Sequence, residues 1–71
     1  MDMWNYRVIK VKDEDEDFYE VCEVYYDPMG LPMGYCAASV ISEKLSEVGE
    51  VLDMMREALS KPVIDSEAFK K

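Results

Sequence analysis

A tight turn at residues 27–30, Asp-Pro-Met-Gly, constrains the fold more than any other feature of this sequence. Aspartate suits the first position of a type I turn, proline suits the second, and glycine supplies the positive φ that the last position needs. Residues 18–26 before the turn and residues 31–40 after it are rich in apolar and aromatic side chains, as strands are. The turn therefore predicts a β-hairpin with a three-residue loop and a bulge.

The turn geometry also predicts a register for this hairpin. Tyr26 is expected to face Pro32, at a site where the missing N–H of proline breaks no ladder bond. Counting back along both strands then places Cys22 opposite Cys36. We expect two reduced, buried thiols, with a disulfide as the alternative, because facing residues at such a site lie at the short end of the disulfide range.

A further strand is expected at residues 4–11, where aromatic and β-branched residues dominate. Residues 12–17 separate it from the hairpin and carry five consecutive carboxylates, which repel one another and predict a solvated turn. A calcium loop starting at Asp13 would need glycine at its sixth position and glutamate at its twelfth, where the chain has Phe18 and Val24. We therefore expect no metal site, and nothing in the sequence indicates a cofactor.

A helix is expected at residues 43–60. Its apolar residues recur at spacings of three and four, which places them on one stripe of a helix: Leu45, Val48, Leu52, Met55 and Leu59. Ser42 is the best available N-cap, and the residue before Pro62 avoids helical geometry, which ends the helix. Gly49 in mid-helix is expected to allow close approach of the helix to the sheet. Residues 63–71 are expected to form a short tail.

These elements predict a single small α+β domain over residues 1–71. Its order is β-β-β-α, a three-stranded antiparallel meander with one helix packed on one sheet face. Alternation along the strands places Cys22, Val24 and Ala38 on one face, where small side chains favour close packing of the helix. The other face is then open and aromatic. Its candidate partner-binding residues are Trp4, Tyr6, Tyr19, Tyr25, Met33 and Tyr35.

Charge and composition limit the classes of function. Sixteen acidic residues stand against eight basic ones, a net charge of −8, which disfavours direct binding of nucleic acid or of anionic membranes. No apolar run is long enough to span a membrane, and the first residues lack the pattern of a signal peptide, so we expect a cytoplasmic protein. The chain has no histidine and no recognisable catalytic constellation, so we expect no enzyme.

Three segments resemble a family of small uncharacterised bacterial proteins. They are Trp-Asn-Tyr-Arg-Val-Ile at residues 4–9, Tyr-Tyr-Asp at residues 25–27 with the following Gly and Pro, and Ala-Leu-Ser-Lys-Pro-Val at residues 58–63. The β-β-β-α order, with a helix beginning near Glu43-Lys44-Leu45, is more distantly similar to HicB-like antitoxin domains. That second resemblance implies binding to a small basic toxin ribonuclease.

We therefore expect a small non-enzymatic protein-interaction module that self-associates as a homodimer through its open sheet face. The reason is physical, because one helix cannot cover two apolar faces of a sheet. The alternative is a HicB-like antitoxin or inhibitor that meets a small basic protein through its acidic surface.

Overall fold

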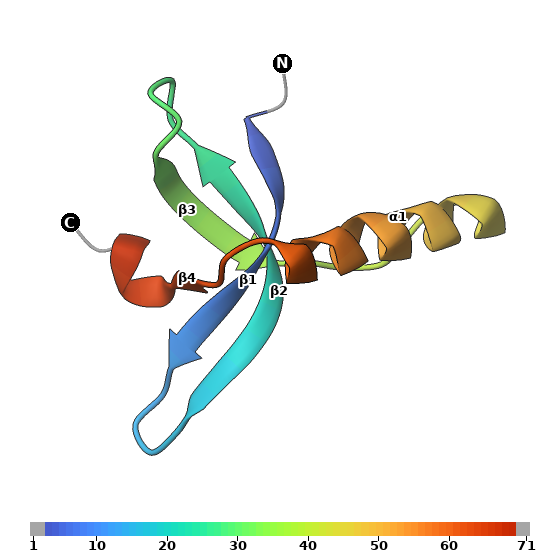
Figure 1. Ribbon diagram of the computed structural model, residues 1–71. Coiled ribbons are helices and arrows are strands. Elements are labelled where there is room, and N and C mark those ends of the chain that lie inside the picture. The colour runs from blue at the N-terminus through green and yellow to red at the C-terminus, as the bar shows by residue number, and fades with distance from the viewer. Residues whose placement is uncertain (1–2, 70–71) are drawn as a thin grey trace.

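The computed structural model describes residues 3–69 and shows an α+β fold with one α-helix. Figure 1 shows the strands crossing near the middle of the molecule, with the helix leaving the sheet to one side. The elements are β1 Trp4–Lys12, β2 Asp17–Tyr26, β3 Pro32–Ala37, α1 Leu45–Glu57, η1 Ala58–Ser60, β4 Ile64–Asp65 and η2 Ser66–Phe69, where η denotes a 3₁₀ helix.

The sheet has four strands in the order β3-β2-β1-β4, so the expected three-stranded meander forms only part of it. β4 pairs with β1 in parallel, with Ile64 beside Ile9, and the sheet is therefore mixed rather than wholly antiparallel. The sequence analysis assigned residues 63–71 to a tail, of which residues 70–71 lie outside the described part. A strand of two residues has no alternating pattern, which is why the sequence did not indicate β4.

The hairpin turn between β2 and β3 forms as expected. The backbone N–H of Gly30 donates to the carbonyl oxygen of Asp27 over 2.9 Å, and Gly30 has a φ of 82°. The Asp27 carboxylate adds support, because its Oδ1 accepts the N–H of Met29 and the N–H of Leu31, each at 2.9 Å. The chemistry of the turn residues therefore fixes this corner of the fold.

The register beyond the turn differs from the expected one by a single residue. Tyr26 faces Pro32 as expected, but the ladder is irregular at the next position, where Tyr25 faces Gly34 and Met33 is left over. This bulge moves every later residue of β3 by one place, so Cys22 faces Ala37. The expected Cys22–Cys36 pair is wrong, because a slip of one residue sends the two side chains to opposite faces. Both cysteines are free, and Cys22 is buried as expected, but Cys36 is exposed, so the expectation of two buried thiols is wrong for Cys36.

One face of the sheet, the C-terminal face, is covered by the segment that follows η1. Ile9, Cys22 and Val24 are fully buried there, beneath the side chains of Ile64 and Phe69. The ring of Phe69 lies 4.7 Å from the ring of Tyr35 between centroids. Nη2 of Arg7 donates to the carbonyl oxygen of Pro62 over 2.6 Å, which ties the segment to β1.

The opposite face, the helix face, carries α1 and η1. Tyr6 and Val8 pack there against the fully buried Ala58, with Val51 and Met55 beside them. The expectation that the helix covers the Cys22–Val24 face is therefore wrong. The bulge explains part of the error, since it moves Ala37 and Tyr35 onto that face. The C-terminal segment then covers the same face with Ile64 and Phe69.

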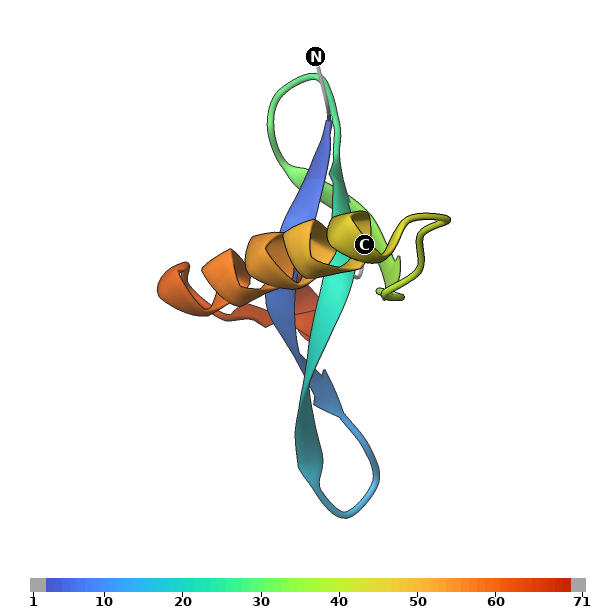
Figure 2. The same cartoon turned by 90° about the vertical axis from the view of Figure 1, so that its right-hand side faces the viewer.

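The helix begins later than expected, and its apolar stripe is rotated. Lys44 rather than Ser42 is the N-cap, and Oγ of Ser42 accepts the N–H of Lys44 over 3.3 Å just before the helix. Leu52, expected in the core, is about half exposed, while Val51 and Ala58 face the sheet instead. Figures 1 and 2 show the reason: the end of α1 near η1 lies against the sheet, and the opposite end points away from it.

Candidate interaction surface

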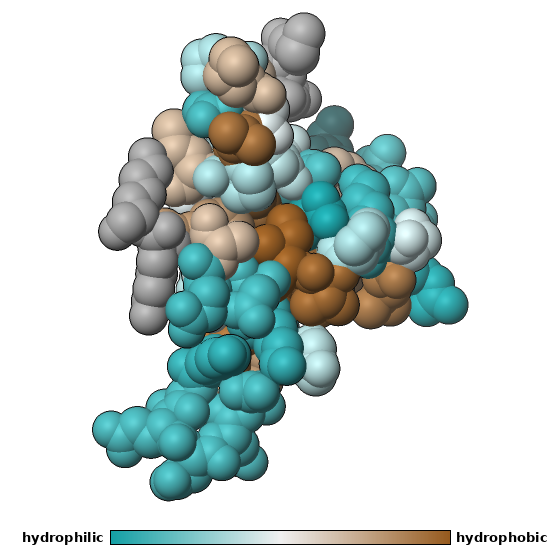
Figure 3. Space-filling view, turned by 60° about the vertical axis from the view of Figure 1, so that its left-hand side comes forward, coloured by the Kyte–Doolittle hydropathy of each residue, from teal (hydrophilic) through white to brown (hydrophobic). Residues whose placement is uncertain are grey.

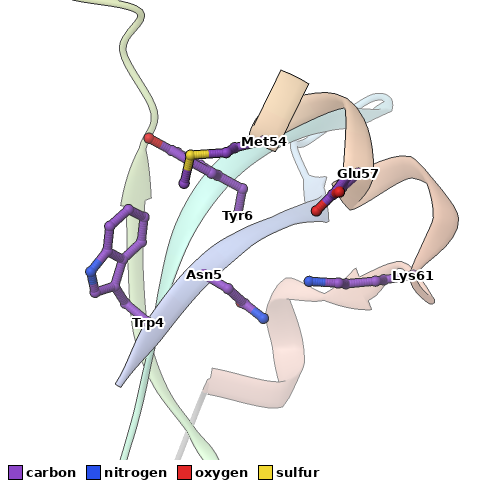
Figure 4. Close-up of a pocket in the computed structure, with 6 residues that line it drawn as sticks. All are labelled: Trp4, Asn5, Tyr6, Met54, Glu57 and Lys61. Atoms are coloured by element: carbon purple, nitrogen blue, oxygen red, sulfur yellow. The ribbon is translucent and has the colours of Figure 1, made fainter. Parts of the chain in front are cut away.

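A small pocket lies where α1 meets β1 (Figure 4). Its volume is about 130 Å³, and it is lined by Trp4, Asn5, Tyr6, Met54, Glu57 and Lys61. Pockets that enclose a small-molecule ligand typically measure about 300–1,000 Å³. The rings of Trp4 and Tyr6 meet edge to face at 5.1 Å and 88°, the geometry of packed aromatic pairs. The pocket is thus better described as a shallow gap at the edge of the hydrophobic core than as a substrate site.

The six candidate partner-binding residues do not share one open surface. Tyr6 is buried under the helix and Trp4 is half-buried beside it. Tyr35 lies on the C-terminal face against Phe69, because the bulge reversed its direction. The remaining three residues are exposed, on or near the helix face: Tyr19, Tyr25 and Met33. The structure brings Trp4 and Tyr6 together as core, and it leaves only these three available to a partner.

Tyr25 is held in place by its neighbours on the sheet. Its hydroxyl donates to Oε1 of Glu23 over 2.6 Å and lies 3.7 Å from Sγ of Cys36. The hydrogen bond to the Glu23 carboxylate, followed by the contact with Cys36, raises the pKa of Tyr25 well above its ordinary value. These two contacts hold the exposed ring of Tyr25 in place at the surface.

The most exposed apolar side chains of α1 and η1 form a row that the sequence analysis had assigned to the core. Leu45, Leu52 and Leu59 are 89%, 51% and 68% exposed. They recur every seven residues, so they lie along one side of the helix, and we call them the leucine row. The apolar stripe of this helix is wider than its contact with the sheet, and the row is the part left over.

Gly49 borders the leucine row at the middle of the helix. A glycine in a helix interior costs about 1 kcal/mol relative to alanine, so its presence needs a use. The expected use was close approach to the sheet, but Gly49 is exposed, and a Cβ built on it meets no atom within 4 Å. That expectation is wrong, and nothing within the described residues approaches Gly49.

Charges are distributed unevenly around the helix. The acidic side chains lie about 100° or more around the axis from the leucine row: Glu47, Glu50, Asp53 and Glu57. Arg56 follows Leu52 by four residues and so borders the row. The leucine row is therefore not flanked by the excess of negative charge that marks the chain as a whole.

A second surface is strongly acidic. Residues 13–17 form the exposed end of the β1–β2 hairpin, closed by a hydrogen bond of 3.0 Å from the N–H of Asp13 to the carbonyl oxygen of Glu16. Figure 3 shows this end as a continuous hydrophilic projection, while the hydrophobic residues gather nearer the helix. Only one ion pair is seen among residues 3–69, between Nζ of Lys10 and Oδ2 of Asp17 at 3.5 Å. Most of these carboxylates therefore face solvent without a cation.

Comparisons with protein-family models, with curated proteins and with solved structures gave no match. The resemblances drawn from the sequence thus remain predictions. Across residues 3–69 no group of three acidic or cysteine side chains is placed to hold a metal ion. No helix in this part of the chain is both long enough and apolar enough to cross a bilayer.

Proposed function

We propose that the protein is a non-enzymatic protein-interaction module that works as a homodimer, formed through the side of the molecule that carries the helix. The observation that supports this proposal is the surface area. The chain exposes 5543 Å², whereas a folded monomer of its mass typically exposes roughly 4,500 Å². The excess is close to the roughly 800 Å² that each partner buries in a standard interface.

The shape of the molecule supports the same conclusion. Its Cα radius of gyration is 13.1 Å, against about 11 Å for a compact domain of this length. The extra extent comes from the projecting helix and the long β1–β2 hairpin (Figure 2). The helix arm is apolar along one side, and the hairpin end is acidic, so we assign self-association to the helix.

Sedimentation velocity on the full chain tests this function. We expect a dimer at high micromolar concentration that dissociates on dilution. Two copies of charge −8 repel each other, so added salt should strengthen the dimer by screening that repulsion. A chain that sediments as a monomer at every concentration and salt level would contradict self-association.

A second candidate function rests on the acidic hairpin end. A HicB-like antitoxin or inhibitor would use such a surface to attract a small basic protein, and added salt would weaken that complex. The two functions therefore respond to salt in opposite directions. Capture of a basic protein by the immobilised chain, lost in high salt and lost when the carboxylates of residues 13–17 are changed to amides, would favour this second function.

A further inference from the structure

We propose that the leucine row of one copy packs against the leucine row of a second copy, in an antiparallel helix pair that crosses near Gly49. This inference rests on the proposed self-association and names its surface and geometry. It moves the proposed interface from the sheet face to the helix, because the exposed residues that share one pattern lie on the helix and not on the sheet.

The spacing of the row indicates that its partner is another helix. Residues that recur every seven positions remain in line along a helix, and they match a second helix that carries the same repeat. Val48 and Met55, both half-buried, fill the alternate positions of the repeat between the leucines. The resulting series, Leu45, Val48, Leu52, Met55 and Leu59, has the three-and-four spacing of a helix-pairing seam.

Gly49 gives this surface a point of close approach. It lies beside Leu45 and Leu52, it is exposed, and no atom of the described chain occupies the space above it. A leucine side chain from a facing helix fits into such a gap, and the two backbones can come closer than larger residues would permit. The glycine therefore has a structural use in a pair of helices that it lacks in a single copy.

The charges select a second copy in the antiparallel orientation. Arg56 lies in the last turn of the helix and borders the leucine row. Antiparallel pairing places the two Arg56 side chains at opposite ends of the helix pair and also opposes the two helix dipoles. Parallel pairing would instead place the two Arg56 charges side by side, where they repel each other. The acidic residues on the far side of the helix stay in solvent in either case.

The first test compares two leucine substitutions by sedimentation equilibrium on the full chain. Leu52→Glu is expected to raise the Kd of the dimer at least about tenfold, as loss of a central interface anchor does. Leu31→Glu is the matched control, because Leu31 is similarly exposed at the hairpin loop, away from the helix. It should leave the Kd unchanged. Circular dichroism would confirm that both variants remain folded.

Gly49→Gln separates an interface role from a structural one. Glutamine is a better helix former than glycine, so the melting temperature of the monomer should stay the same or rise, while the side chain blocks the close approach and weakens the dimer.

The outcomes distinguish this inference from the proposed function. A wild-type chain that never dimerises removes both. A wild-type dimer that survives Leu52→Glu and Gly49→Gln but is lost with Tyr25→Glu would overturn the leucine row and leave self-association standing, through the exposed tyrosines of the sheet. Loss of the dimer in the two helix variants, with the Leu31→Glu dimer intact, supports the helix pair.

Discussion

The two faces of the sheet are covered in different ways, although both are apolar. The C-terminal face is covered by a short irregular segment, yet Ile9, Cys22 and Val24 beneath it are completely buried. The helix face is covered by a longer regular element, yet only Ala58 reaches full burial there. The number of residues in a covering element thus matters less than how closely its backbone follows the sheet. The helix follows it only at one end, and its remaining apolar side is free for another purpose.

The largest effect is expected on the C-terminal face and is tested with one buried and one exposed isoleucine. Ile9→Ala should lower the free energy of unfolding by about 2–5 kcal/mol, because a fully buried side chain leaves a cavity. Ile41→Ala, in the loop before the helix, should change it by less than about 0.5 kcal/mol, because Ile41 is 80% exposed. Urea denaturation of both variants, at a concentration where the chain is monomeric, measures the two values. Equal effects would show that Ile9 does not contribute the packing that its complete burial indicates.

Alkaline pH should also act on the C-terminal face. Burial, followed by the nearby Glu20 carboxylate, raises the pKa of the Cys22 thiol from 9.0 to about 11. The folded chain then keeps a proton that the unfolded chain has lost, so the stabilisation is complete below pH 9 and declines as the pH rises from 9 to 11. Its full size is about 2–3 kcal/mol. Unfolding of the wild type and of Cys22→Ala, compared across this range, should show the extra decline only in the wild type.

A smaller effect is expected where the C-terminal segment meets the sheet edge. Phe69→Leu should cost about 1 kcal/mol, because it removes the ring contact with Tyr35 while keeping an apolar side chain. Phe18→Leu is the matched control, since Phe18 is nearly half exposed and has no ring partner within residues 3–69. Chemical denaturation gives both values. A larger cost for Phe18→Leu would mean that the ring contact does not help to hold the segment.

Local chemistry in this sequence predicted the corner of the hairpin, the first two strands and the end of the helix region at residue 60, because turn residues and periodic runs act over short distances. It did not predict the bulge at Met33, because an extra residue leaves alternation intact on each side of itself. That single residue reversed Tyr35 and separated the cysteines.

The candidate site was harder to predict for a different reason. The helix carried a broad apolar stripe, and the sequence does not say which part of such a stripe meets the sheet. Leu52 was therefore placed in the core, whereas Val51 and Ala58 take that place. The signal for the leucine row was present as a seven-residue repeat, but a core stripe and a pairing seam look alike in one sequence.

The parallel pairing of β4 with β1 has a consequence for the order in which this chain can acquire its structure. Ile64 and Ile9 are separated by most of the polypeptide, and residues 64–69 are synthesised after every other described element. During translation the strands β1 to β3 can therefore assemble while Ile9, Cys22 and Val24 still face water. This apolar surface stays exposed until the last described segment has left the ribosome. During that interval a nascent chain of this kind is most vulnerable to aggregation.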